Sequence, residues 1–137
     1  MPSHPPSSEV IAHIDGASRG NPGPAAFGVV LETHEGARIA TISKTIGHTT
    51  NNVAEYHGLL AVLEYALEHK VRRLKVLSDS ELMARQIQGA YKVKSSDLKP
   101  LFERARNAIA RLESFSIHHV RREHNREADR LDRKSVV

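Results

Sequence analysis

The sequence predicts an α/β domain built on a mixed β-sheet. Three strand-like segments follow one another near the start of the chain, and helix-like and strand-like segments alternate after them. The 137 residues are 39% hydrophobic and 26% charged, which suits one soluble domain with a single core. We expect that domain over residues 9–137, preceded by a disordered tail over residues 1–8 that is rich in proline and serine.

The strands are predicted from short apolar runs and turn residues. Val10, Ala12 and Ile14 alternate with polar residues, as in a half-buried strand. Gly36 lies in a short connection between the next two apolar runs and predicts a hairpin. The five predicted strands are residues 9–15, 25–33, 38–47, 73–79 and 115–121.

The helices are predicted from apolar residues at helical spacing. Leu60, Leu63 and Leu67 lie on one stripe of the longest segment, and Gly89 is placed to end the next helix. The predicted helices are residues 51–69, 80–89, 97–113 and 125–134. A strand that follows a crossover helix lies parallel to the first strand, so the strands that end at Asp15 and Asp79 should be neighbours. Ligands bind at this carboxyl end of parallel strands.

Composition narrows the possible partners and cofactors. Residues 1–69 carry three basic and seven acidic side chains, whereas residues 70–137 carry seventeen and nine. This asymmetry indicates either a polyanionic partner or an ordinary solvated surface. The chain has no cysteine, which excludes disulfides and thiolate metal sites and is compatible with a reducing compartment. No apolar run is long enough for a membrane span, so we expect a cytoplasmic protein that does not contact membranes.

Four carboxylates should converge at one end of the predicted sheet: Asp15, Glu55, Asp79 and Asp129. Clustered carboxylates repel one another, and a fold keeps such a cluster when cations neutralise it. An all-oxygen site suits Mg²⁺ or Mn²⁺. Four carboxylates are too many for one Mg²⁺, and they suit two ions bridged by a shared carboxylate, as in enzymes that cleave phosphodiesters.

Each carboxylate also has a structural interpretation. Asp15 is placed to be a turn residue, and Asp79 to belong to the cap of the next helix, where Ser80 is the stronger N-cap candidate. Glu55 is placed to close a capping box with Asn52. Asp129 lies in a predicted helix among Arg126, Arg130 and Arg133, as on a solvated face.

Four blocks of the sequence, in order, resemble the signatures of the type 1 ribonucleases H: residues 15–30, 50–66, 78–101 and 120–131. The resemblance implies the ribonuclease H-like fold, a five-stranded mixed sheet with helices on both faces. It implies a metal-dependent endonuclease that cuts the RNA strand of RNA–DNA hybrids and leaves a 5′-phosphate and a 3′-hydroxyl. In that family's terms Asp15 would bridge two ions, Glu55 and Asp79 would hold one, and Asp129 would help to hold the other.

The resemblance also implies residues that contact the hybrid. Residues matching Asn21, Asn51 and Asn52 contact sugars and base edges in the family, and the residue matching Thr50 helps to hold a DNA phosphate. His48 stands where the family often has an arginine in the phosphate pocket.

The chain departs from many members of the family in two places. It lacks their basic, tryptophan-containing insertion, so it resembles the compact subgroup. His124 is either the counterpart of a histidine that aids product release or an ordinary surface histidine. Two other functions remain open: a binding module of the same fold without chemistry, and a nuclease of the same fold that acts on another duplex. We expect a monomer.

Overall fold

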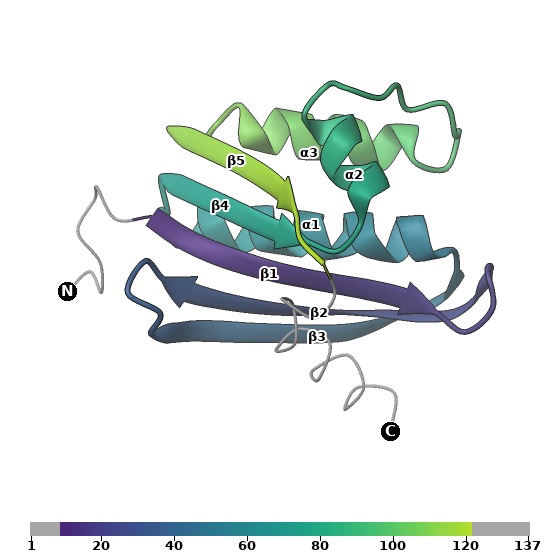
Figure 1. Ribbon diagram of the computed structural model, residues 1–137, viewed down its shortest axis with the longest axis horizontal. Helices are drawn as coiled ribbons and strands as arrows, with labels where there is room; N and C mark the ends of the chain where they lie inside the picture. The colour runs from purple at the N-terminus through teal and green to yellow at the C-terminus, as the bar shows by residue number, and fades with distance from the viewer. Residues whose placement is uncertain (1–8, 122–137) are drawn as a thin grey trace.

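The computed structural model describes residues 9–121 of the chain (Figure 1). The predicted N-terminal tail, the predicted helix over residues 125–134, Asp129 and His124 all lie outside the described residues. The elements in chain order are β1 (Glu9–Ser18), β2 (Gly23–Thr33), β3 (Arg38–Thr49), α1 (Asn51–Glu68), β4 (Arg73–Ser78), α2 (Glu81–Ile87), α3 (Lys99–Ile109) and β5 (Ser114–His119).

The five strands form one mixed sheet in the order β3-β2-β1-β4-β5. The pairs β1–β2 and β2–β3 are antiparallel, whereas β1–β4 and β4–β5 are parallel. The prediction of a five-stranded mixed sheet with helices is confirmed. Strand β1 is therefore the junction between the hairpin half and the crossover half of the sheet.

Strand β1 is longer than predicted. Pairing with β2 continues from Asp15 opposite Gly28 to Ser18 opposite Ala25, so the predicted end of this strand at residue 15 is wrong. Gly16 stays in the strand, and the parallel pairing with β4 ends one residue before Asp15, where Ile14 lies opposite Ser78. Asp15 is thus a strand residue that still lies at the carboxyl end of the parallel pair.

The helix ends follow from their capping residues. Thr50 is the N-cap of α1, and its side chain accepts a hydrogen bond from Val53 N at 3.2 Å. Ser80 caps α2 in the same way, through Met83 N at 3.2 Å, and Gly89 follows that helix with φ +89°. Helix α3 is shorter at both ends than predicted, and its N-cap position, Leu98, makes no side-chain capping bond.

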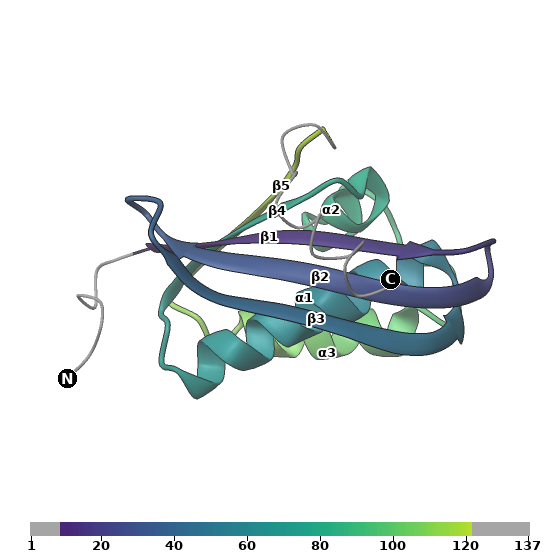
Figure 2. The same ribbon diagram turned by 90° about the horizontal axis from the view of Figure 1, so that it is seen from below.

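The core lies between the sheet and its helices. Helices α1 and α3 lie on the same face of the sheet (Figure 2). The core between these helices and the sheet includes Val10, Ala12 and Ile14 of β1, together with Leu59 and Leu63 of α1. None of the helices within residues 9–121 is long and apolar enough to cross a membrane.

Candidate metal centre

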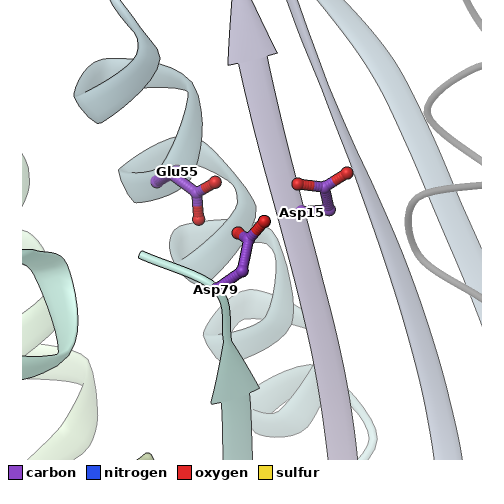
Figure 3. A group of neighbouring side chains, drawn as sticks. All are labelled: Asp15, Glu55 and Asp79. Carbon is purple, nitrogen blue, oxygen red and sulfur yellow. The ribbon is translucent and has the colours of Figure 1, made fainter. Parts of the chain in front are cut away.

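Three of the four predicted carboxylates come together where β1, β4 and α1 meet. Asp15 lies in β1, Glu55 lies in the second turn of α1, and Asp79 follows the last residue of β4 (Figure 3). One carboxylate oxygen from each residue lies within 4.8 Å of the others. Asp15 and Glu55 are buried, with 1% and 4% of their surface exposed, and Asp79 is half-buried. Three separate segments therefore place acidic oxygens at one point.

Gly16 allows α1 to approach β1 at this point. A Cβ at position 16 would lie 2.8 Å from the backbone carbon of Ala54 and 2.8 Å from Glu55 N, which is too close for any side chain. The backbone N–H of Gly16 also donates a hydrogen bond to Glu55 Oε1 at 2.7 Å. The glycine thus sets the distance between helix and strand and orients one of the carboxylates.

Ser78 holds the other oxygen of Glu55. Its hydroxyl donates to Glu55 Oε2 at 3.1 Å and accepts a hydrogen bond from Ser80 N at 3.0 Å. Burial raises the pKa of Glu55 well above its ordinary value, and the Asp79 and Asp15 carboxylates raise it further, against the hydrogen bonds from Gly16 and Ser78. A positive charge at this site would stabilise the ionised carboxylates and so oppose the rise in the pKa of Glu55.

The donor set fits a hard divalent cation. All three side chains offer carboxylate oxygens, which Mg²⁺ and Mn²⁺ prefer, and residues 9–121 add no nitrogen or sulfur donor to the cluster that would favour a softer metal. Two of the three carboxylates are buried beside each other, an arrangement that costs free energy without a cation. Asp15, Glu55 and Asp79 could therefore hold a divalent ion.

The structural interpretations of three acids are wrong. Thr50, not Asn52, caps α1, and Glu55 uses both carboxylate oxygens for Gly16 and Ser78, so there is no capping box. Ser80 caps α2, as the sequence indicated, so Asp79 is not the cap. Asp15 lies within β1 and is not a turn residue.

The predicted hybrid-contacting residues lie around the start of α1. Asn51 Oδ1 accepts hydrogen bonds from Ser18 N at 2.7 Å and Ser18 Oγ at 2.8 Å, and Asn51 N donates to Asn21 Oδ1 at 3.0 Å. Asn52 is half-buried in the first turn of the same helix. The last of these bonds links Asn21, in the turn between β1 and β2, to Asn51, the first residue of α1. His48 lies on β3 opposite Pro24, is exposed, and is not in the carboxylate group.

Sequence reasoning missed three residues of this region. Gly16 was not assigned the role that it has here: its N–H binds Glu55, and its missing side chain lets α1 approach β1. Ser78 and Ser18 were not singled out at all. Ser78 could have been noticed as a hydroxyl at the end of an apolar strand, directly before an aspartate. Ser18 carries no such local signal, because its partner Asn51 is 33 residues away.

The sheet order and the carboxylates at its parallel junction define a ribonuclease H-like domain. In agreement, the family model described as "Reverse transcriptase-like" matches residues 13–135. The chain belongs to this family of ribonuclease H-like proteins, as the sequence blocks indicated. Residues 88–98 form the whole connection between α2 and α3, which is the short connection expected of the compact subgroup.

Three relatives illustrate the similarity. Ribonuclease HI of Halobacterium salinarum is 42% identical over 127 residues, which cover 93% of this chain and 64% of the relative. The crystal structure of that archaeon's RNase H1 superimposes with a TM-score of 0.89 at 41% identity, covering 93% of this chain and 97% of that one. The Mycobacterium tuberculosis bifunctional protein Rv2228c is 41% identical over 124 residues, covering 90% of this chain.

Two further solved structures match closely. The N-terminal RNase H domain of Rv2228c has a TM-score of 0.90 at 39% identity, covering 94% of both chains. LC11-RNase H1, solved in complex with an RNA/DNA hybrid, has a TM-score of 0.85 at 39% identity, covering 91% of this chain and 94% of that one. The chain spans only 64% of the curated Halobacterium relative and 34% of full-length Rv2228c. The similarity therefore concerns the ribonuclease H domain of these proteins.

Proposed function

We propose that this protein is a metal-dependent endonuclease that hydrolyses the RNA strand of RNA–DNA hybrids and leaves a 5′-phosphate and a 3′-hydroxyl. The observation that carries the proposal is the meeting of Asp15, Glu55 and Asp79 within 4.8 Å, on the fold of the ribonucleases H. LC11-RNase H1, a similar protein, has been solved with a hybrid bound, which supports the choice of substrate.

In this proposal the carboxylates hold two divalent ions when substrate is bound, with Asp129 as the fourth acid. Such ions lower the pKa of water and neutralise charge on a phosphate. By the resemblance to the ribonucleases H, Asp15, which lies beside Glu55 and Asp79, would take the bridging position (Figure 3). Gly16 and Ser78 keep the Glu55 carboxylate in a fixed orientation, and Glu55 and Asp79 together would hold one of the ions.

Substrate binding is assigned to polar residues beside the acids. Asn21, Asn51 and Asn52, around the start of α1, are assigned to sugars and base edges, which are the features exposed in the wide minor groove of A-form helices. Thr50 already caps α1, so any contact of its hydroxyl with a DNA phosphate is made in addition to that bond. His48, exposed on β3, is assigned to the same phosphate. We propose that His124 aids product release.

Cleavage assays test the proposal directly. A labelled RNA–DNA hybrid is incubated with the full chain, with Mg²⁺ or Mn²⁺ and with EDTA, and the product ends are identified. We expect cleavage only with metal, and Asp15→Asn should lower kcat by about a thousandfold or more, because the bridging position can no longer hold its charge. Ser43→Ala, on the exposed surface of β3, serves as the control variant.

Two other outcomes would support the competing functions. Hybrid binding without cleavage under any of these metals would indicate a binding module of the same fold. Faster cleavage of duplex RNA or duplex DNA than of the hybrid would indicate a nuclease with another substrate. We further propose that the protein acts as a monomer in the cytoplasm, which gel filtration and cell fractionation would test.

A further inference from the structure

A groove lies between the edge strand β3 and helices α1 and α3. Its volume is about 460 Å³, which is within the range of small-molecule sites. Its apolar lining includes Phe27, Ile42 and Leu60, and charged and aromatic side chains complete it. None of the three clustered carboxylates lines this groove, so it is separate from the candidate metal centre.

Three basic side chains from separate elements line the groove. Lys44 comes from β3, His57 from α1 and Arg104 from α3. Within residues 9–121 none of these side chains forms a hydrogen bond or an ion pair, although the groove also contains two glutamates. Basic groups from three elements therefore face one hollow and are not neutralised by any described residue.

The electrostatics of His57 reflect this gathering of basic groups. Burial lowers the pKa of His57 below its ordinary value, and the charges of Arg104 and Lys44 lower it further. A neighbouring anion would act in the opposite direction, because it stabilises the protonated imidazole. The clustered carboxylates favour a cation, and by the same argument these three side chains favour an anion.

Further along α1 the groove is aromatic and acidic. The rings of Tyr65 and His69 stack with their centroids 4.0 Å apart, and both residues line the groove together with Glu64 and Glu68. Tyr65 lies more than two helical turns, about 12 Å, beyond His57. Carboxylates repel anions and accept hydrogen bonds from amino groups, and nucleobases stack on aromatic rings. The lining therefore suits a ligand with an anionic group at one end and a planar, amino-bearing ring at the other.

We propose that this groove binds a nucleoside monophosphate, with the phosphate held by Lys44, His57 and Arg104 and the base stacked beside Tyr65. The apolar lining between these two ends covers the sugar and the edge of the base. The same chemical groups occur in a nucleic acid strand, and the experiments below separate the two sources. Occupancy of this site does not depend on the proposed function.

Titration with AMP in EDTA tests the site, because the carboxylates without metal repel phosphate. The imidazole NMR signal of His57, assigned by its loss in His57→Gln, should shift on addition of AMP or ribose 5-phosphate, and the pKa of His57 should rise. AMP should bind about tenfold more tightly than ribose 5-phosphate, because its base adds stacking. An unchanged His57 signal with both phosphates would overturn the anion site. Equal affinity for both would overturn the assignment of a nucleotide.

Side-chain variants separate specific contacts from general positive charge. Lys44→Ala and Arg104→Ala should each weaken AMP binding about tenfold, the size of a hydrogen bond to a charged group. Lys99→Ala removes the same charge from the exposed start of α3, outside the groove, and should leave AMP affinity unchanged. Tyr65→Leu should reduce AMP affinity to that of ribose 5-phosphate. An equal loss in Lys99→Ala, or full AMP affinity in a folded Tyr65→Leu, would contradict the assigned contacts.

Hybrid affinity distinguishes a free nucleotide from a nucleic acid strand. Fluorescence anisotropy with a labelled RNA–DNA hybrid in EDTA should show that Lys44→Ala and Arg104→Ala weaken hybrid binding no more than Lys99→Ala does, and that AMP does not displace the hybrid. Displacement by AMP, or a tenfold loss of hybrid affinity in the groove variants alone, would assign the groove to nucleic acid and overturn the proposed ligand. These measurements use neither metal nor cleavage, so a protein that fails to cleave hybrids would still show AMP binding.

Discussion

The contact between α1 and β1 contains two neighbouring buried regions, one apolar and one acidic. Further along the helix, Gly58 packs against Ile14 so closely that a Cβ at position 58 would lie 2.6 Å from Ile14 Cγ2. This apolar region stabilises the fold by removing hydrocarbon surface from water. One turn earlier, Glu55 is equally buried, yet it lies against Asp15 and Asp79, which share its charge. We call the two regions the packed region and the acidic region.

The difference shows how one strand serves both stability and chemistry. Ile14 and Gly16 pack directly against α1, and Asp15 between them brings its carboxylate within 4.8 Å of that of Glu55 on the same helix. The packed region can hold the acidic region in place because both use the same helix and the same strand. The acidic region is then expected to lower the stability of the metal-free protein. The predictions below test that contrast, beginning with the largest effect.

Gly16→Ala should disturb both the packing of α1 on β1 and the position of Glu55. Its methyl group would meet the backbone of Ala54 and Glu55, which cannot rotate away as a flexible side chain could. We expect a loss of about 1–3 kcal/mol of unfolding free energy, as for other overpacked sites, and at least a hundredfold lower hybrid cleavage because Glu55 is displaced. Urea denaturation and cleavage rates measure the two effects.

A glycine with open space provides the control for this variant. A Cβ at Gly36 would meet nothing within 4 Å, although φ there is +93°, so Gly36→Ala carries backbone strain alone. It should lower stability modestly and leave cleavage unchanged. Equal losses of cleavage in both variants would mean that close packing at Gly16 does not position Glu55.

Tyr56→Phe should weaken the packed region and leave the acidic region intact. The Tyr56 hydroxyl donates to Gln86 Oε1 at 2.7 Å, and both residues are buried, so the bond fastens α2 to α1. Without the hydroxyl a buried amide oxygen loses its donor, which costs about 1–3 kcal/mol. Thermal denaturation should show a lower Tm, while kcat at temperatures well below Tm stays within about twofold of wild type. A large fall in kcat with unchanged Tm would contradict this separation.

The packed region was easier to predict than the acidic one. Apolar periodicity is a local signal, so α1, its inward face and the presence of the five strands followed from short stretches such as Val10, Ala12 and Ile14. The end of β1 did not, because Gly16 looks like a turn residue until the helix that packs on it is present. The three acids could be named, but their hydrogen bonds to Gly16 and Ser78 depend on tertiary contacts across 39 and 23 residues.

Glu55→Gln should raise the stability of the metal-free protein at neutral pH. The Glu55 pKa is raised in the folded state, so between its ordinary value and the raised value the folded protein binds more protons than the unfolded chain. Stability of the wild type should therefore fall as pH rises through that window. The glutamine removes the buried charge while its oxygen can still accept from Gly16 N. We expect a gain of about 0.5–2 kcal/mol.

The pH dependence of stability shows whether the gain comes from removing the buried Glu55 charge or from another effect of the substitution. Denaturation of both proteins in EDTA, at several pH values from 4 upward, should give curves that converge at acidic pH, where the wild-type carboxyl is protonated in both states. A constant difference at every pH would show that burial of the Glu55 charge is not its source. With Mg²⁺ the order should reverse, because only the wild type keeps all of its ligands.

Asp79→Asn should have the smallest effect on stability and yet a large one on activity. Asp79 is half-buried, and Ser80 rather than Asp79 caps α2, so the capping bond of that helix is kept when the carboxylate becomes an amide. Repulsion with Glu55 and Asp15 falls, so the metal-free protein should be as stable as wild type or more stable by less than about 1 kcal/mol. A marked fall in Tm would instead identify Asp79 as a structural residue of the β4–α2 turn. Because a metal ligand would be lost, the cleavage rate and the stabilisation of the protein by Mg²⁺ should both fall. A fall in only one of these two quantities would show that metal binding at Asp79 and cleavage are separate properties of this site.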